Sequence, residues 1–277
     1  MKMSSLVLSA AVSCCVLYSP SAWAQASHDA GTRAAAASTA TAPAKAEVTW
    51  WGHAAFILRT PGGAVIAIDP WLKNPKAPAG AALPDALDAI LVTHGHFDHV
   101  GDTAELAKKT GATVYGAYEL VSLIGAKNSQ PTNVGATFRI KDVTLHVVTA
   151  VHSSGYSAPD SKDAAKYGGS PLGYVLSVDK GPTLYHAGDT GVFGDMALIA
   201  EQFKPTYAML PIGGVFTMDP AGAALAARLL KVKTVIPMHF GTFPALTGTP
   251  AELAAELKKA KVSAKVEALT VGTPTAL

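Results

Sequence analysis

Short runs of apolar and β-branched residues recur along the chain from Glu47 onward, and turn-forming residues separate them. Runs of roughly four to eight such residues, bounded by Gly or Pro, are typical of β-strands. They predict strands at Val48–Trp51, Ala54–Leu58, Val65–Ile68, Ala89–Val92, Thr137–Ile140, Val143–Val148, Tyr174–Val178, Thr183–Tyr185 and Thr234–Pro237. Pro61-Gly62-Gly63 lies between two of these runs and predicts a hairpin.

Helix start signals stand between the later strand runs. Asp102 followed by Glu105 predicts an N-cap with its partner at N3, and Gly111 predicts the end of that helix. Further helices are predicted to begin at Asp195, at Asp219-Pro220 and at Thr249-Pro250-Ala251-Glu252. Two strand-rich halves, each closed by helices, predict an α/β fold, a four-layer αββα sandwich with the helices outside.

The first 45 residues have a different pattern. Lys2 precedes a 13-residue uncharged stretch, Leu6–Tyr18, and Ala22-Trp23-Ala24 matches a signal-peptidase site. This stretch is too short for a membrane-spanning helix, which needs about 20 apolar residues. We therefore expect a cleaved signal peptide over 1–24 and a periplasmic or secreted protein. An uncleaved anchor and a lipidated Cys14 are the alternatives. Residues 25–45 lack large apolar side chains and predict a flexible Ala/Ser/Thr-rich linker before one domain over 46–277.

Charge and cysteine content narrow the chemistry. The 277 residues include 22 basic and 20 acidic ones, and the four arginines are scattered. Nucleic-acid binding needs clustered Lys and Arg, so this balance argues against it. Both cysteines, Cys14 and Cys15, lie in the predicted signal peptide, so the mature chain has no thiolate ligand or cysteine nucleophile. A catalytic centre must be built from His, carboxylates and hydroxyls.

A cluster of ligand-type residues follows the predicted strand Ala89–Val92. His94 and His96 occupy alternate positions of an extended turn and can point to one side, and Asp98 and His99 follow on the next turn of chain. Three imidazoles and a carboxylate this close cannot all face one divalent ion without strain, but they can serve two neighbouring ions. The motif therefore predicts metal binding.

Three further ligand-type residues each follow an apolar strand run. His152 follows Val147–Val151, Asp189 follows Tyr185–Gly188, and His239 follows Val235–Met238. Sheets commonly present functional loops at such strand ends. We expect these side chains to complete a dinuclear site with the four residues above.

The order H-x-H-x-D-H, then a lone His, a lone Asp and a final His, resembles the ligand order of the metallo-β-lactamase superfamily. The chain resembles one branch of this superfamily more closely: the small metal-dependent hydrolases related to the ascorbate-6-phosphate lactonases. The motifs are Trp51-Gly52-His53, Ile68-Asp69-Pro70-Trp71, His152-Ser153-Ser154, Tyr185-His186-Ala187-Gly188-Asp189-Thr190-Gly191, Pro211-Ile212-Gly213, Phe216-Thr217-Met218, Pro237-Met238-His239 and Thr242-Phe243-Pro244. The resemblance covers about Val48 to Glu252. Many relatives carry polar residues where Gly214 and Val215 stand, so substrate contacts of that loop are not carried over.

The resemblance also implies a division of the ligands. His94, His96 and His152 would hold one metal, Asp98, His99 and His239 the second, and Asp189 would bridge them. This set of N and O ligands suits two Zn²⁺ ions and also Mn²⁺ or Fe²⁺. Because a water shared by two such ions loses a proton near neutral pH, the implied activity is hydrolysis of a small ester, lactone or phosphoester by a metal-bridging hydroxide.

Other polar residues near these motifs are candidates for supporting roles. Asp69 is expected to orient a ligand His through its free N–H, unless it only forms the turn before Pro70. Asp102 is expected to support the ligands in the same way or only to cap a helix. His53 and His186 are expected to contact a ligand or the substrate, with plain packing as the alternative. They join Asp98 and Asp189 as the predicted catalytic group. His146 lies in an alternating strand and is expected to be structural.

The segment Ser153 to Pro171 begins directly after His152 and is rich in Gly, Ser and Lys. Loops of this length are usually functional or disordered, so it is a candidate lid, with an idle surface insertion as the alternative. We expect a small-molecule substrate as partner, and no nucleic acid or membrane after signal cleavage.

Two other functions compete with this hydrolase. A secreted β-lactamase-like enzyme fits the signal peptide, but superfamily β-lactamases generally lack a bridging Asp at the position of Asp189. A non-catalytic metal-binding scaffold would be indicated by a missing ligand, and the sequence lacks none of the seven.

Overall fold

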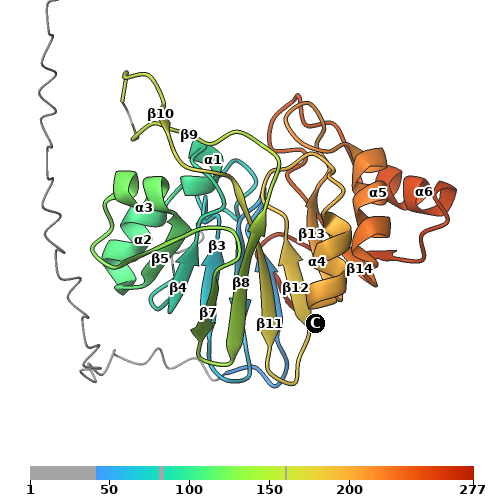
Figure 1. Cartoon of the computed structure of the whole chain (residues 1–277), viewed down its shortest axis with the longest axis horizontal. Coiled ribbons are helices and arrows are strands. Elements are labelled where there is room, and N and C mark those ends of the chain that lie inside the picture. Colours follow the sequence, from blue (N-terminus) through green and yellow to red (C-terminus); the bar gives the residue numbers. More distant parts are fainter. Residues whose placement is uncertain (1–41, 81–83, 160) are drawn as a thin grey trace, which may run out of the picture. The chain divides into compact units, whose positions relative to one another are not determined.

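Two seven-stranded mixed sheets lie face to face, and helices cover the outer side of each (Figure 1). The computed structural model describes residues 42–80, 84–159 and 161–277. The signal peptide predicted for 1–24, and the predicted linker as far as residue 41, lie outside the described residues. In the described part of the chain, no helix has the length and apolar character needed to cross a membrane.

The first sheet carries the amino-terminal half of the domain and the last strand of the chain. Its strand order is β16-β1-β2-β3-β4-β5-β6, and β3 to β6 run parallel. The strands are β1 Glu47–Trp50, β2 Phe56–Arg59, β3 Val65–Ile68, β4 Ala89–Leu91, β5 Thr113–Ala117, β6 Ser129–Thr132 and β16 Pro274–Ala276. The predicted hairpin at 61–63 joins β2 to β3. The helices on this side are α1 Phe97–Val100, α2 Thr103–Thr110 and α3 Tyr118–Ile124.

The second sheet carries the carboxy-terminal half. Its strand order is β15-β14-β13-β12-β11-β8-β7. The strands are β7 Thr137–Ile140, β8 Val143–Thr149, β11 Leu172–Val178, β12 Thr183–His186, β13 Tyr207–Pro211, β14 Thr234–Met238 and β15 Lys265–Val266. Helices α4 Met196–Phe203, α5 Pro220–Leu230 and α6 Pro250–Lys259 lie on its outer side (Figure 1).

The predicted four-layer αββα sandwich is confirmed. Strand residues alternate between two apolar clusters, as the two-residue period of a strand requires. Tyr174 and Leu176 of β11 point into the core between the sheets, whereas Val175 between them packs with the residues under α4, α5 and α6. Each sheet therefore buries both faces, which explains the nearly unbroken apolar runs in the sequence.

The sequence signals located some elements and missed others. The predicted caps at Asp219 and Thr249 are confirmed, the latter as a full capping box with Glu252. Strands β5, β6 and β13 and helix α3 were not among the predicted elements. β6 is a polar edge strand that contains a proline, and the N-cap residue of α3 is Ala117, which has no side chain that can cap a helix. Neither element therefore carries the usual signal.

Candidate metal centre

The ligand-type residues stand at one edge of both sheets. Strands β1, β3 and β4 end at the same edge of the first sheet, because β2 is antiparallel to β1 and β3 while β4 is parallel to β3. In the second sheet β8, β12 and β14 likewise end together. The loops after these six strands carry His53, Asp69, His94–His99, His152, Asp189 and His239.

The structure brings the seven predicted ligands together in two groups. One group contains His94, His96, His152 and Asp189, and its ligand atoms all lie within 4.8 Å of one another. The other satisfies the same limit and contains His53, Asp98, His99 and His239. The predicted division of the histidines between two sites is therefore reproduced in the geometry, with His53 as an additional member.

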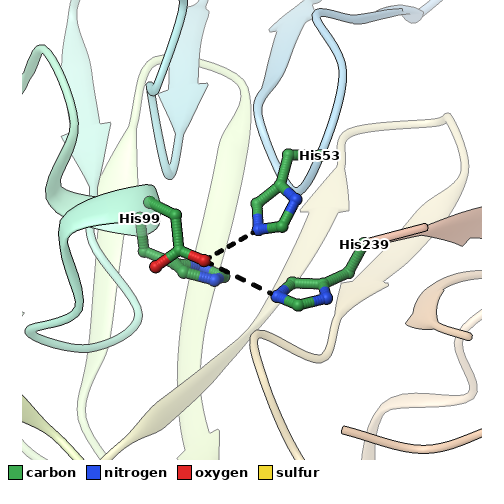
Figure 2. A group of neighbouring side chains, drawn as sticks. His53, His99 and His239 are labelled. Carbon is green, nitrogen blue, oxygen red and sulfur yellow. Dashed lines mark hydrogen bonds and ion pairs between the residues drawn. The ribbon is translucent and has the colours of Figure 1, made fainter. Parts of the chain in front are cut away.

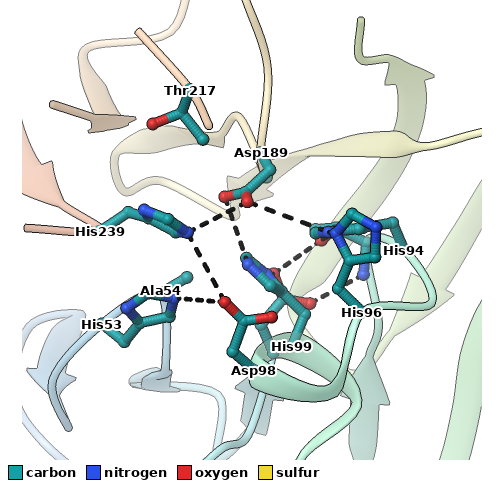
Figure 3. Close-up of polar contacts among 12 residues, drawn as sticks. His53, Ala54, His94, His96, Asp98, His99, Asp189, Thr217 and His239 are labelled. Carbon is teal, nitrogen blue, oxygen red and sulfur yellow. Dashed lines mark hydrogen bonds and ion pairs between the residues drawn. The ribbon is translucent and has the colours of Figure 1, made fainter. Parts of the chain in front are cut away.

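Asp189 stands between the two groups (Figure 3). Its Oδ1 lies 3.2 Å from His99 Nε2, and its Oδ2 lies 3.1 Å from His239 Nε2. The same Oδ2 lies 3.6 Å from His152 Nε2 and 3.9 Å from His94 Nε2. A single carboxylate therefore faces imidazoles of both groups, which is the position that a bridging ligand needs.

His53 was predicted to contact a ligand or the substrate within the catalytic group, and the structure places it against the ligand Asp98. The side chain is fully buried, with Nε2 3.0 Å from Asp98 Oδ2 and Nδ1 3.0 Å from Thr242 Oγ1. Figure 2 shows His53 and His239 directed at the carboxylate from two sides. Burial lowers the pKa of His53 to about 4, although the hydrogen bond that its ring donates to Asp98 opposes this shift. His53 is thus neutral near pH 7 and either positions Asp98 or is itself a ligand.

Four buried ligand atoms have no hydrogen-bond partner among the described residues: His99 Nε2, Asp189 Oδ1 and both ring nitrogens of His239. Three of them, all but His239 Nδ1, take part in the close charge contacts above without forming a hydrogen bond there. Leaving a buried polar atom unpaired costs about 1–3 kcal/mol, and native proteins rarely do so without a ligand or water. Imidazole nitrogens and carboxylate oxygens are the donors that Zn²⁺, Mn²⁺ and Fe²⁺ accept. The residues fit a metal centre.

The charges also suit bound cations. Burial lowers the pKa values of His94, His96 and His152, so these rings are neutral, as a metal ligand must be. Burial would raise the pKa of Asp189, but His99 and His239 outweigh it and hold that pKa well below the usual range. Asp189 is therefore ionised despite being almost completely buried.

Asp69 contacts the ligand loop as predicted. Its buried carboxylate accepts hydrogen bonds from Thr93 N at 2.8 Å and Thr93 Oγ1 at 2.7 Å, and its Oδ2 lies 2.7 Å from His99 Nδ1. Burial lowers the pKa of His99, but Asp189 and Asp69 outweigh burial and raise it. Asp69 thus fixes the ring of His99 so that Nε2 faces the centre.

His186 and Asp102 do not have the expected contacts. His186 Nε2 lies 3.1 Å from the Ala54 carbonyl oxygen, and its Nδ1 accepts from Gly188 N at 3.2 Å. It holds the backbone before Asp189 and does not line the cavity, so its assignment as catalytic is corrected. Asp102 makes no capping hydrogen bond; its Oδ2 accepts from the backbone N–H of Leu72 and Lys73 at 2.8 and 3.1 Å. Asp102 therefore supports the loop that contains Leu72 and Lys73, and it does not orient a predicted ligand.

Strained backbone occurs at three of these residues. His53, Asp69 and His239 have φ values of 52°, 44° and 56°, in the left-handed region. Asp and His adopt this region more readily than most residues, at a cost of order 1–3 kcal/mol each. Hydrogen bonds between the loops of the two sheets hold these residues in the strained conformation: His239 N, for example, donates to the His53 carbonyl at 3.0 Å.

A cavity of about 910 Å³ opens over the centre. Its floor contains ligand residues from both groups, and its walls are largely apolar. The lining residues are His96, Phe97, Asp98, His152, Ser153, Gly155, Ser157, Asp189, Val215, Phe216, His239, Phe243, Pro244 and Ala245. The aromatic walls were not among the candidate site residues, although Thr242-Phe243-Pro244 was one of the recognised motifs.

The candidate lid at 153–171 contains a two-stranded hairpin, β9 Gly155–Tyr156 and β10 Lys166–Tyr167. Its first turn is joined to the ligand loop, since Gly95 N donates to Ser154 Oγ at 3.1 Å. Its two ends are joined to each other, since Gly168 N donates to the Ser154 carbonyl at 2.7 Å. Residues Ser153, Gly155 and Ser157 line the cavity. His146, expected to be structural, hydrogen-bonds Thr137 and stacks on Phe203, away from the ligands.

Comparisons with known proteins agree with this geometry. A family model described as a beta-lactamase superfamily domain matches residues 64–240. A UPF0173 metal-dependent hydrolase of Myxococcus xanthus is 65% identical over 250 residues, which are 90% of this chain and 88% of that protein. A solved metallo hydrolase from Ignicoccus hospitalis is 34% identical, with a TM-score of 0.73, over 84% of this chain and 98% of its own. An isothiocyanate hydrolase from Delia radicum gut bacteria shares the fold at 21% identity, with a TM-score of 0.64, over 83% of this chain and 98% of its own.

Proposed function

The chain belongs to the metal-dependent hydrolases of the beta-lactamase superfamily, and from that premise we propose that it is a dinuclear enzyme acting on a small ester, lactone or phosphoester. The observation that carries the proposal is the position of Asp189, whose single carboxylate faces imidazoles of two separate groups of ligand-type side chains. The relation to the ascorbate-6-phosphate lactonases stays a prediction.

The residues would divide as their geometry suggests. His94, His96 and His152 would hold one divalent cation, Asp98, His99 and His239 the other, and Asp189 would contact both. When bound, such cations supply Lewis acidity toward the substrate and lower the pKa of water. The donor set favours Zn²⁺ and also admits Mn²⁺ or Fe²⁺.

The remaining chemistry belongs to the protein's own groups. Asp189 is ionised, and its negative charge offsets the repulsion between two cations at neighbouring sites. His53 holds Asp98, and Asp69 holds His99, so two ligands of the same group keep fixed orientations. The apolar walls at Phe97 and Phe243 keep bulk water from the reacting bond, which strengthens the electrostatic interactions in the cavity.

The test is a screen of a neutral ester, a lactone, a phosphodiester and a β-lactam with the purified mature protein. Each is assayed with Zn²⁺ or Mn²⁺ and again after chelation. We expect metal-dependent turnover of at least one of the first three, and turnover at the same rate for the control His146→Ala. A folded, metal-loaded protein that turns over none of them would support the non-catalytic scaffold, and turnover of the β-lactam alone would support a β-lactamase.

The predicted signal peptide adds a location to this proposal. We propose that the mature enzyme starts near residue 25 and works in the periplasm or outside the cell. Expression of the full chain in a secreting bacterium, followed by mass measurement of the exported protein, tests this. Retention of residues 1–24 on the purified protein would contradict it.

A further inference from the structure

The walls of the cavity are formed by exposed apolar side chains. Phe97, Val215 and Phe216 expose 66%, 74% and 59% of their surface, although large apolar side chains are usually buried. Phe97 lies on one ligand loop, and Val215 and Phe216 lie on the turn after β13. Together with Phe243 they give the metal centre an apolar surround, and much of that apolar surface stays exposed in the folded protein. Exposed apolar patches beside a site commonly mark a binding surface.

Three aromatic rings stabilise one of these walls. Trp71 stacks on Phe243 with ring centroids 5.8 Å apart, and it contacts Phe97 edge to face at 5.6 Å. Phe97 and Phe243 lie 6.4 Å apart. Because each ring is supported by the other two, this wall is preorganised for an apolar group, and little conformational entropy is lost on binding.

The part of the lining formed by the turn after β13 has a strained conformation. Val215 has a φ of 58°, which is a genuine outlier for a β-branched residue. Backbone hydrogen bonds fix the turn: Gly214 N donates to Met218 O at 3.0 Å, and Met218 N donates to Thr190 O at 3.2 Å, next to Asp189. A glycine would adopt this conformation without strain. Strain of this kind persists mainly at functional sites, so the valine side chain itself is the feature to explain.

The lining carries no cationic side chain. Among the described residues, neither Lys nor Arg lines the cavity, and its polar groups outside the ligands are Ser153 and Ser157. A carboxylate or phosphate on the part of the substrate distant from the ligands would therefore be buried against apolar walls without a partner, which is strongly unfavourable.

We propose that the substrate's distal part, away from the bond that is cleaved, is apolar and uncharged, and that Val215 and Phe216 determine this specificity. The inference rests on the proposed hydrolase function and narrows its substrate class. An acyl chain or aromatic group of the substrate lies between the Val215–Phe216 turn and the Phe97–Phe243 wall, while the reacting carbonyl or phosphoryl group lies over the ligands.

Two esters that differ only at the distal end test the proposal. 4-Nitrophenyl hexanoate ends in a methyl group, and the mono-4-nitrophenyl ester of adipic acid ends in a carboxylate on a chain of the same length. After subtraction of the rate without enzyme, we expect kcat/KM to be at least about tenfold higher for hexanoate, the discrimination typical of an apolar pocket. Equal values, or a preference for the adipate, would overturn the proposal.

Variants of the Val215–Phe216 turn then test whether this turn causes the preference for hexanoate over adipate. Phe216→Ala and Val215→Gly are expected to reduce the hexanoate-to-adipate ratio several-fold, mainly through KM for hexanoate. Val215→Gly also relieves the positive φ, so its Tm should hold or rise while specificity falls. The matched control Leu198→Ala truncates an exposed apolar side chain of α4 that does not line the cavity, and it should keep the wild-type ratio. A ratio unchanged in both turn variants would show that this turn does not set specificity.

A binding measurement separates this inference from the hydrolase proposal. The corresponding 4-nitroanilides are amides and far poorer substrates, and their binding is followed by calorimetry with the metal-loaded protein. Tighter binding of the hexanoyl than of the adipoyl compound supports the apolar site even if neither ester is hydrolysed. Hydrolysis of both esters without a preference would leave the hydrolase standing and overturn the apolar site.

Discussion

Replacing Asp69 by Asn should weaken metal binding although Asp69 is not itself a predicted ligand. The Asp69 carboxylate accepts two hydrogen bonds from Thr93 and pairs with His99 Nδ1 at 2.7 Å, and it is fully buried. An Asn keeps one oxygen, which can still accept from the Thr93 N–H. An NH₂ group then replaces Oδ2, and it can accept neither from the Thr93 hydroxyl nor from the His99 ring. The Thr93 hydroxyl can rotate and accept a hydrogen bond from this NH₂ group, whereas the ring N–H of His99 cannot.

The loss is therefore one buried, charge-assisted hydrogen bond on a ligand. Such a loss costs about 1–3 kcal/mol of folding stability. Substitution of groups that orient ligand histidines typically lowers metal affinity about 10–100-fold. We expect both effects in Asp69→Asn, with the metal held by His99 lost first.

Asp102→Asn is the matched control. Asp102 is also nearly buried and also supports a loop, but both of its backbone hydrogen bonds go to Oδ2, and an Asn oxygen can accept them. The substitution removes the ion pair with Lys73, whose side chain is 59% exposed, and such pairs contribute about 0–1 kcal/mol. No predicted ligand contacts Asp102, so its metal affinity should equal that of the wild type.

The assay is competition for Zn²⁺ with a chromophoric chelator, paired with urea unfolding of each chelated protein. Wild-type affinity for both ions in Asp69→Asn would refute the orienting role of Asp69. An equal loss of affinity in Asp102→Asn would show that general destabilisation, and not the orientation of His99, controls metal binding.

Three more perturbations test other parts of the centre. Asp189→Asn should abolish turnover and release at least one metal ion, since a neutral amide offsets little of the repulsion between two cations. The control His146→Ala should keep activity and metal content within about twofold of wild type, and equal losses in both variants would contradict the roles given to these two residues. Replacing 157–165 by a short Gly-Ser turn should change the ratio of kcat/KM for two unlike substrates. Elemental analysis should find the metal retained, because the contacts of Ser154 with Gly95 and Gly168 remain; an unchanged ratio would mean that 157–165 is no lid. Chelation should lower the calorimetric Tm and cost about 4 kcal/mol at metal concentrations near a thousand times Kd, and an unchanged Tm would exclude stabilising metal binding.

The sequence predicted those features that a short local pattern of residue types is enough to specify. Pro at the first helical position predicted the first residues of α5 and α6, and the ligand cluster after β4 predicted the position of the centre. Both signals are local, since caps and strand ends are properties of neighbouring residues. The contact between His94 and His152 needed the pairing of distant strands, which the ligand order of a known family implied.

The misassigned residues show what local patterns omit. His53 and His186 both stand next to a strand end, yet one contacts Asp98 and the other two backbone groups. The difference arises from the direction of each side chain across the two sheets, which periodicity does not specify. The aromatic wall was missed for a similar reason, because Phe97 and Phe243 are far apart in sequence and each alone resembles an ordinary apolar residue.

The central claim is that this chain binds two metal ions through seven side chains at one edge of two sheets. Elemental analysis of the purified mature protein, after reconstitution with Zn²⁺ or Mn²⁺ and removal of loosely bound metal, tests it most directly. We expect close to two ions per chain, falling to one or fewer in Asp189→Asn. One ion or fewer in the reconstituted wild-type protein would contradict the dinuclear centre.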